Sequence, residues 1–302
     1  MDTNILLENG TNEVEILEFT LGGNHYGINV AKIKEILSYQ KITPVPNAHP
    51  CVEGIFMPRD LMISVINLKR CIGIPETEEE GLFIITNFNK LNIAFHVDTV
   101  IGIHRVSWAD IITPDATINT EEAGVSTGVI KIDDKLIVIL DFEKIVTDIS
   151  PETGLKVSDI EHMEENVERE KCPILIAEDS PLLSKLITDC LRKAGYTKQI
   201  VTPNGQEAWD KLIEMKDNGT LMKNVQCIIT DIEMPIMDGH RLTKLCKEDE
   251  TIQKIPLVIF SSLVNDEMRR KGEQLGADAQ LTKPEIGHLV DAIDGLIKKY
   301  FG

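Results

Sequence analysis

The chain has 302 residues, 42% of them hydrophobic, and its 49 acids against 31 bases give a formal net charge of −18. This length allows about two domains, and an acidic chain without a basic stripe is a poor candidate for binding nucleic acid or inserting into an anionic membrane. The six cysteines form no CxxC pair, which argues against a zinc or thioredoxin-type site. We find no secretory signal and no membrane span, and therefore expect a cytoplasmic protein.

The first half of the chain contains many short apolar runs separated by turns. The runs that predict strands lie at residues 16–21, 63–68, 82–86, 92–97 and 135–140. Gly22-Gly23-Asn24 and Asp133-Asp134 predict tight hairpin turns. The spacing of Val30, Ile33, Ile36 and Leu37 predicts one short helix over residues 30–37. Short strands at this spacing indicate small barrels or a sandwich.

The second half alternates apolar runs with amphipathic segments. Four strand-like runs end at residues 177, 230, 260 and 282, and helices are predicted over 181–194, 206–215, 240–247, 266–275 and 286–300. Ser180 followed by Pro181 is a good helix start. Alternation of this kind predicts a doubly wound parallel α/β sheet. We therefore expect one domain over 12–147, an acidic linker over 148–171 and a second domain over 172–302.

Polar residues with complementary chemistry follow the four strand-like runs of the second half. The runs lead into Glu178-Asp179, Asp231, Ser261 and Lys283. In an open parallel sheet the carboxyl ends of the strands meet in one crevice, so we expect these side chains to converge. Each residue alone would be an ordinary turn, cap or surface residue, but the combination in strand order is specific to phosphoryl chemistry.

The expected site would hold magnesium beside a carboxylate nucleophile. Asp179 and Asp231 would supply carboxylate ligands, Glu178 would act through a water, and the backbone carbonyl of Glu233 could add an oxygen. Asp231 would attack the phosphoryl group in line.

The other two residues of the expected site would contact the phosphate itself. Lys283 would supply a compact cation to the phosphorylated product, and the Ser261 hydroxyl would donate a hydrogen bond to it. Together with the carboxylates, they complete a phosphoacceptor site.

These residues, with Met234-Pro235 and Asp238-Gly239, resemble the receiver domain of two-component response regulators over residues 173–302. The resemblance implies a flavodoxin-like fold and phosphorylation of Asp231 by a histidine kinase with Mg²⁺. One departure is Gln280, which occupies a position where the family usually has a Tyr or Phe that rotates on activation. We therefore expect the phosphorylation signal to travel through the loop at 261–264 instead.

The first half has no phosphate loop, no metalloprotease motif and no nucleophile elbow, and its histidines have no ligand spacing. It resembles the CheW-like adaptor domain of bacterial chemotaxis. The resemblance rests on residues 19–22, 26–28, 34–36, 42–47 (Ile-Thr-Pro-Val-Pro-Asn), 54–55, 65–68 and 140–141, and on Arg59. It implies two small five-stranded barrels that contact chemoreceptor tips and the histidine kinase CheA.

Arg59 is the candidate partner-binding residue, although the surrounding loop, Met57-Pro58-Arg59-Asp60, departs from the family's usual Asn-Leu-Arg-Gly. The alternative is that Arg59 is an ordinary solvated arginine. Because Met57, Pro58 and Asp60 do not match the family's loop, we expect docking in the family's usual manner with altered specificity.

An adaptor followed by a receiver is the architecture of the CheV-type coupling proteins, and the chain resembles them. The resemblance implies a phosphoacceptor adaptor, not an enzyme, that joins CheA to receptors at cytoplasmic receptor arrays and is regulated through Asp231. The alternatives are a receiver that only drains phosphate from the kinase, a scaffold with an inert receiver, and a phosphatase with an aspartyl nucleophile. The phosphatase reading is weakened by Asp231-Ile232-Glu233, because such enzymes usually have Asp-x-Asp.

Overall fold

A computed structural model describes residues 11–76, 80–88, 91–112, 124–150, 169–262, 266–283 and 286–302. The chain divides into two compact units, one built around residues 14–153 and the other around 154–302. We call them the adaptor unit and the receiver unit. No helix in the described ranges is both long enough and apolar enough to cross a membrane.

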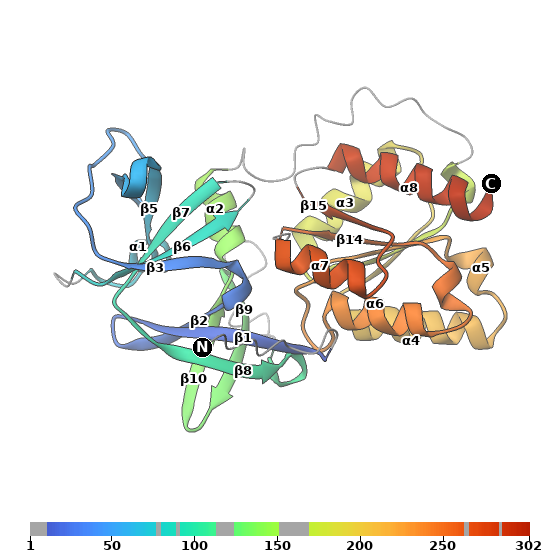
Figure 1. Ribbon diagram of the computed structural model, residues 1–302, viewed down its shortest axis with the longest axis horizontal. Coiled ribbons are helices and arrows are strands. Elements are labelled where there is room, and N and C mark those ends of the chain that lie inside the picture. The colour runs from blue at the N-terminus through green and yellow to red at the C-terminus, as the bar shows by residue number, and fades with distance from the viewer. Residues whose placement is uncertain are drawn as a thin grey trace. The chain divides into compact units, whose positions relative to one another are not determined.

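The first sheet of the adaptor unit has five strands in the order β8-β1-β2-β10-β9 (Figure 1). Its strands are β1 (Glu13–Leu21), β2 (Asn24–Asn29), β8 (Thr99–Ser107), β9 (Ser126–Ile132) and β10 (Lys135–Leu140). Gly22 and Gly23, both with positive φ, form the β1–β2 turn, and Asp133 with φ 53° begins the β9–β10 turn. Both predicted hairpins are confirmed.

The second sheet of the adaptor unit has the order β3-β6-β7-β5-β4. Its strands are β3 (Ile33–Ser38), β4 (Val52–Phe56), β5 (Ile63–Asn67), β6 (Leu82–Phe88) and β7 (Leu91–Val97). The short helices are η1 (Val30–Lys32), η2 (Pro58–Asp60), α1 (Leu68–Cys71), η3 (Trp108–Asp110) and α2 (Phe142–Ile149). The prediction of two five-stranded β units is confirmed.

One apolar cluster joins strands of both sheets to α2. The ring of Phe142 on α2 lies 6.1 Å from Phe19 of the first sheet and 4.2 Å from Phe95 of the second, centroid to centroid. Ile145 and Val146 of α2 are buried in the same cluster. Helix α2 therefore closes the adaptor core and fixes the two sheets against each other.

The predicted helix over 30–37 is wrong. Residues 30–32 form the single turn η1, and the rest is strand β3, which pairs with β6 so that Ile36 faces Ile84. Burial along β3 alternates: Ile33 and Leu37 are half-buried, and Ile36 is 39% exposed. The helical spacing arose because Ile36 was counted as a core residue. In the structure the segment pairs with the buried strand β6, so its side chains alternate between the two faces of the sheet.

The receiver unit is a five-stranded sheet whose paired strands are all parallel, in the order β12-β11-β13-β14-β15. Its strands are β11 (Ile174–Ala177), β12 (Gln199–Thr202), β13 (Cys227–Thr230), β14 (Leu257–Ser261) and β15 (Ala279–Thr282). This is the flavodoxin-like strand order, with its switch point where the order reverses at β11 and β13. The predicted doubly wound sheet is confirmed.

Helices cover both faces of the receiver sheet, with α3 and α8 on one face and α4 and α6 on the other (Figure 1). The helices are η6 (Arg169–Lys171), α3 (Pro181–Lys193), α4 (Gly205–Asp217), α5 (Leu221–Asn224), α6 (Gly239–Glu248), η7 (Ile252–Lys254), α7 (Asp266–Gln274) and α8 (Ile286–Phe301). Ser180 caps α3 by accepting a hydrogen bond from the Leu183 N–H. The five predicted helices are confirmed within a few residues, whereas α5 and β12 were not predicted.

Two contacts bear on where the units end. Helix α2 extends to Ile149 with its apolar face in the adaptor core, and Arg169 forms a two-point ion pair with Asp294 of α8, at 2.6 and 3.1 Å. The predicted acidic linker lies mostly outside the described residues. Its limits, 148 and 171, stay a prediction.

Candidate functional site

Three charged side chains meet at the carboxyl ends of receiver strands. Glu178 follows β11, Asp231 follows β13 and Lys283 follows β15, and all three are buried. The Lys283 ammonium lies 2.5 Å from Asp231 Oδ2 and 3.1 Å from Glu178 Oε2. Parallel pairing through β14 brings these strand ends to one edge, as the sequence predicted.

The carboxylates of Glu178, Asp179 and Asp231 form the candidate metal centre. Ligand oxygens from the three residues lie within 4.8 Å of one another. Burial raises the pKa of Glu178 well above its usual range, Lys283 opposes that rise, and the neighbouring Asp231 adds to it. A hard divalent cation would offset this concentration of negative charge, and carboxylate oxygens are among the hard donors that Mg²⁺ takes in proteins. The residues present therefore fit a magnesium ion.

Ser261 and Glu233 occupy neighbouring positions. Ser261 is the last residue of β14 and is buried, and its carbonyl accepts a hydrogen bond from the Lys283 N–H at 3.3 Å. This backbone contact places the hydroxyl-bearing residue and the lysine on adjoining strand ends. Glu233 is half-buried, two residues after Asp231, and its role as a carbonyl ligand stays a prediction.

Gly239 allows the loop after β13 to fold back onto Asp231. The Gly239 N–H donates to the Ile232 carbonyl at 2.9 Å, and a Cβ at Gly239 would lie only 1.8 Å from the Asp231 carbonyl oxygen. Asp238 then caps α6 by accepting from the Arg241 N–H at 2.6 Å. The Asp238-Gly239 pair thus fixes the loop that follows Asp231.

His240 is a residue that sequence reasoning missed. It is 7% exposed on α6, one residue beyond Gly239, and its Nε2 has no hydrogen-bond partner among the described residues. Burial and then the positive charge of Lys271 lower the pKa of His240 to about 4, so the ring is neutral in the fold at pH 7. A lone histidine after Asp-Gly carries no sequence signal for this environment.

Arg59 projects from the β4–β5 connection of the adaptor unit. Its side chain is 83% exposed and lies 3.7 Å from Glu35 Oε2, which is a long, solvated ion pair. Arg59 and Asp60 both adopt left-handed backbone angles, with φ of 52° and 64°. The loop is therefore tightly turned and presents the arginine to solvent.

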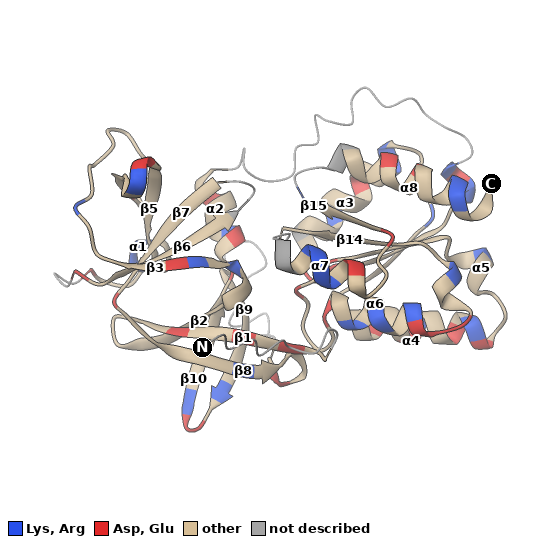
Figure 2. Ribbon diagram, in the orientation of Figure 1, with Lys and Arg blue, Asp and Glu red and all other residues tan. Residues whose placement is uncertain are grey.

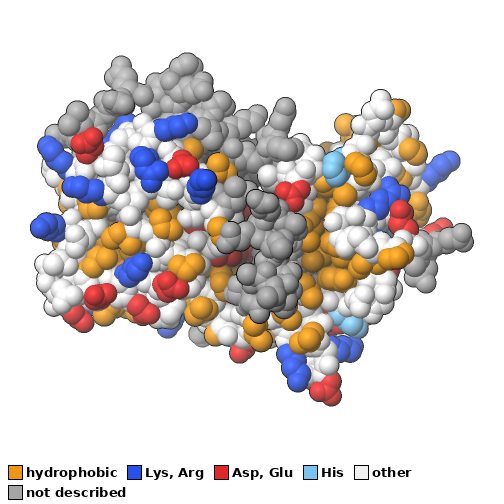
Figure 3. All heavy atoms as spheres, turned by 180° about the vertical axis from the view of Figure 1, so that it is seen from behind, with side chains coloured by type: hydrophobic (Ala, Val, Ile, Leu, Met, Phe, Trp, Pro, Cys, Tyr) orange, Lys and Arg blue, Asp and Glu red, His pale blue; other side chains and the backbone are white. Residues whose placement is uncertain are grey.

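Large apolar side chains are exposed mainly on the adaptor unit, where they gather on the face seen in Figure 3. Among described adaptor residues they are Ile36, Val45, Met57, Leu61, Met62, Leu91, Ile101, Ile103, Ile112 and Leu136. The receiver unit has fewer, and Figure 2 shows acidic and basic residues interspersed along its helices α4, α6 and α8. Exposed apolar side chains that gather on one face are a feature of protein-binding surfaces.

Comparison with known proteins matches both units to families. Residues 15–150 match the CheW-like domain and residues 174–294 match the response regulator receiver domain. The chain is 29% identical to chemotaxis protein CheV3 of Helicobacter pylori, over 95% of this chain and 96% of that protein. It is also 29% identical to CheV2 of the same organism, over 91% and 92%. Residues of the adaptor unit are 31% identical to chemotaxis protein CheW of Thermotoga maritima, covering 49% of this chain and 98% of that protein.

The chain belongs to the CheV-type chemotaxis coupling proteins. Its two units are the CheW-like and receiver domains that define this type, in the same order and over nearly the whole length of the CheV relatives. The resemblance inferred from strand-end residues and the adaptor motifs is therefore confirmed at the level of family and fold.

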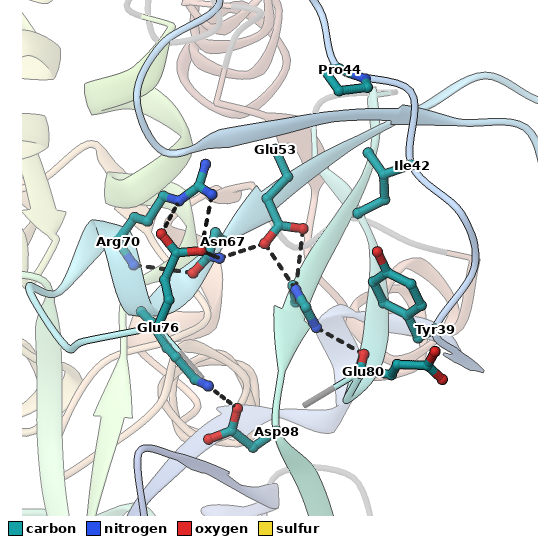
Figure 4. Close-up of a pocket in the computed structure, with 11 residues that line it drawn as sticks. Tyr39, Ile42, Pro44, Glu53, Asn67, Arg70, Glu76, Glu80 and Asp98 are labelled. Carbon is teal, nitrogen blue, oxygen red and sulfur yellow. Dashed lines mark hydrogen bonds and ion pairs between the residues drawn. The ribbon is translucent and has the colours of Figure 1, made fainter. Parts of the chain in front are cut away.

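The CheW-like domain of this CheV-type protein contains a polar cavity of about 430 Å³ (Figure 4). His96 lies there between two acceptors, with Nδ1 3.0 Å from Glu53 Oε1 and Nε2 3.0 Å from the Glu80 carbonyl. Arg70 and Glu76 form a two-point ion pair at 2.7 and 2.9 Å. These groups satisfy one another beside the cavity, and both ring nitrogens of His96 are engaged in structural contacts.

Proposed function

We propose that Asp231 of this CheV-type protein accepts a phosphoryl group from a phosphohistidine of the kinase CheA, with Mg²⁺. The observation that carries the proposal is the contact of one buried ammonium, Lys283, with both Asp231 and Glu178 at the strand ends. A buried lysine held by two carboxylates is a preformed cation site beside a nucleophile. Structural ion pairs seldom combine this placement with a third carboxylate, here Asp179, within ligand distance.

Each residue has a separate role in the proposed transfer. An Asp231 carboxylate oxygen attacks the phosphorus of a phosphohistidine whose other ring nitrogen carries a proton. The bond from phosphorus to the histidine nitrogen breaks, and an acyl phosphate and a neutral histidine result. Lys283 exchanges its carboxylate contacts for the phosphoryl oxygens, and the Ser261 hydroxyl donates a hydrogen bond to them.

The proposed metal ligands are Glu178, Asp179, Asp231 and the carbonyl of Glu233. Mg²⁺ bound there would neutralise charge that develops on the phosphoryl oxygens. The chain's own contribution is a buried carboxylate cluster and a fixed loop after β13. We propose a phosphoacceptor adaptor in which the product is a modified protein and not a released molecule.

We propose that the adaptor unit binds the CheA regulatory domain and chemoreceptor tips, and so locates the protein at cytoplasmic receptor arrays. Support comes from its similarity to a chemotaxis CheW over almost all of that protein's length and from its exposed apolar side chains. A CheA-type relative, the sensor histidine kinase CheAY of Helicobacter pylori, also matches part of the chain, at 25% identity. Arg59 is the proposed contact residue.

The phosphoacceptor proposal is tested by intact-mass measurement. Incubation with acetyl phosphate and Mg²⁺ should add one phosphoryl group, and excess chelator should prevent the addition. Asp231→Asn should take none, and Lys283→Ala should fold but lose the phosphate-dependent response. An adduct that persists in Asp231→Asn, or that is indifferent to chelator, would place the chemistry elsewhere. Release of more than stoichiometric phosphate from a phosphoester would favour the phosphatase alternative.

The adaptor proposal is tested by titrating residues 1–150 against the CheA regulatory domain and a receptor-tip fragment. Binding to at least one of them without the receiver unit is expected, and binding to neither would refute the proposal. Unchanged affinities after treatment of the full chain with beryllofluoride would leave the phosphate-sink alternative standing.

A further inference from the structure

Gln280 lies on the edge strand of the receiver sheet and faces α7. Its neighbours in β15, Ala279 and Leu281, pack against the core on the α3 and α8 side, so the alternation of a strand turns Gln280 to the opposite face. There its Nε2 donates a hydrogen bond of 2.7 Å to the backbone carbonyl of Arg269 in α7. The side chain thus ties an edge strand to the helix packed beside it.

Gly272 provides the space for this contact. A Cβ built on Gly272 would lie 2.3 Å from Gln280 Oε1 and 2.5 Å from its Cδ, so the amide rests directly on the helix backbone. Arg269 and Gly272 are three residues apart and share one face of α7. Glycine inside a helix costs about 1 kcal/mol relative to alanine, and the close approach of the Gln280 amide is a packing reason for it here.

The contact is only half satisfied. Gln280 Oε1 is buried and has no hydrogen-bond partner among the described residues. The side chain therefore holds α7 through a single hydrogen bond, which suits an attachment that opens when the strand moves.

The same strand carries the lysine of the phosphoacceptor site. Lys283 follows β15 directly, and Ser261 at the end of β14 is paired with Thr282 of β15. Movement of Lys283 and Ser261 toward a phosphoryl group would act on the strand on which Gln280 stands, three residues before the lysine.

We propose that Gln280 and Gly272 form a latch that holds α7 against β15 in the unphosphorylated receiver and opens when Asp231 is phosphorylated. Gln280 is a positioning residue in this mechanism. Opening releases α7 from β15. A small movement of Lys283 toward the phosphoryl group would thus loosen the helix. The opening of the latch on phosphorylation rests on the proposed function of Asp231. The contact that holds α7 in the unphosphorylated protein does not depend on that proposal.

The latch is tested in the full chain by amide hydrogen exchange of α7, without phosphate and with beryllofluoride. Gln280→Ala removes the hydrogen bond, and Gly272→Ala displaces the amide by steric contact. Without beryllofluoride, Gln280→Ala should raise α7 exchange about two- to tenfold, the range that one neutral hydrogen bond supplies. Gly272→Ala should raise it by a similar factor once the gain from replacing a helical glycine by alanine is subtracted. The double variant should exceed the single ones little, because both remove the same contact. With beryllofluoride, wild-type exchange should rise toward that of the variants.

Gly295→Ala in α8 is the matched control, because a Cβ there meets no atom within 4 Å. It reports the effect of replacing a helical glycine by alanine without any contact. Free-state α7 exchange in Gln280→Ala equal to that of wild type would overturn the latch.

Failure of the latch and failure of the proposed function give different results. Unchanged α7 exchange in Gln280→Ala, together with a normal Asp231 adduct, would overturn the latch and leave the phosphoacceptor intact. A wild-type chain that takes no phosphoryl group would overturn the phosphoacceptor and the phosphate-driven opening. Free-state exchange would then still decide whether the latch holds α7.

Discussion

In the receiver unit, Glu178, Asp231 and Lys283 are buried at the ends of three parallel strands, where one ammonium serves two carboxylates. In the adaptor unit, His96 of β7 and Glu53 of β4 pair across the intervening strand β5 beside a cavity, and large apolar side chains are left on the surface. The receiver concentrates charge where a reaction could use it. The adaptor neutralises charge internally and leaves contact surface outside, as a binding module does.

The largest effect should come from the backbone of the loop between β13 and α6. Gly239→Ala brings a Cβ to 1.8 Å from the Asp231 carbonyl oxygen, so the receiver should lose about 3 kcal/mol or more of its free energy of unfolding. The chain has one tryptophan in each unit, Trp108 and Trp209. Urea unfolding followed by fluorescence in a Trp108→Phe background therefore reports the receiver.

A Trp209→Phe background reports the adaptor, which should unfold as in the parent chain. Gly295→Ala is the control, because a Cβ at this position meets no atom within 4 Å. If Gly239→Ala lowers the free energy of unfolding equally in both units, the units unfold together. The contrast between an independent receiver and an independent adaptor would then be wrong.

The buried His240 and the half-buried His96 should respond to pH in opposite directions. His240 has a folded pKa of about 4, below the value near 6.5 of an unfolded histidine. Its neutral burial therefore supports the receiver above pH 6.5, and that support is lost as the pH falls from 6.5 toward 4, by about 3 kcal/mol at full effect. His240→Met should remove this dependence. Comparing wild type with the variant cancels the titration of Glu178 and Asp238, whose pKa values burial raises.

His96 should show the reverse trend in the adaptor. Burial opposes its charge, but Glu53 and the Glu80 carbonyl outweigh burial and raise the pKa of His96. Its stabilisation is complete below the unfolded value near 6.5 and is lost as the pH rises through the folded pKa. His96→Gln should cost about 1 kcal/mol at low pH and flatten that dependence in the Trp209→Phe background. A wild-type adaptor that gains stability with rising pH over this interval would contradict the double-acceptor geometry.

The smallest effect on stability should come from Arg59. Its side chain is 83% exposed, so Arg59→Glu should change unfolding by less than about 0.5 kcal/mol. It should nevertheless weaken binding to the CheA regulatory domain or a receptor tip about tenfold if the arginine is a hot spot. Lys135→Glu, an exposed charge reversal at the β9–β10 turn, is the control. If calorimetric titrations show that both variants lose the same affinity, the loss comes from the change in net charge and not from a direct contact of Arg59.

Local signals in the sequence predicted much of the fold. Ser180-Pro181 marked the start of α3, and the residues after four apolar runs indicated the strand ends that converge. The short edge strand β12 was missed because Gln199–Thr202 has only two apolar residues. The failure over 30–37 has a similar cause, because pairing with β6, about fifty residues away, decides the period there.

The parts of the site that sequence reasoning did not reach depend on burial and close approach. Gln280 was recognised as unusual, but its contact with Gly272 is set by how β15 packs on α7. The lowered pKa of His240 likewise depends on the helices that enclose it. Residue type predicts what a group can do, whereas these two properties come from what surrounds it.

The strand order of the first adaptor sheet has a consequence for synthesis on the ribosome. Strand β2 lies between β1 and β10, so its second edge waits for residues 135–140. The second sheet uses only β3 to β7, a continuous stretch from Ile33 to Val97, and can form while the chain is still emerging. The first two strands to be made would then be among the last to complete their pairing. During that interval β2 has an open edge, and the nascent adaptor is most exposed to mispairing with other chains.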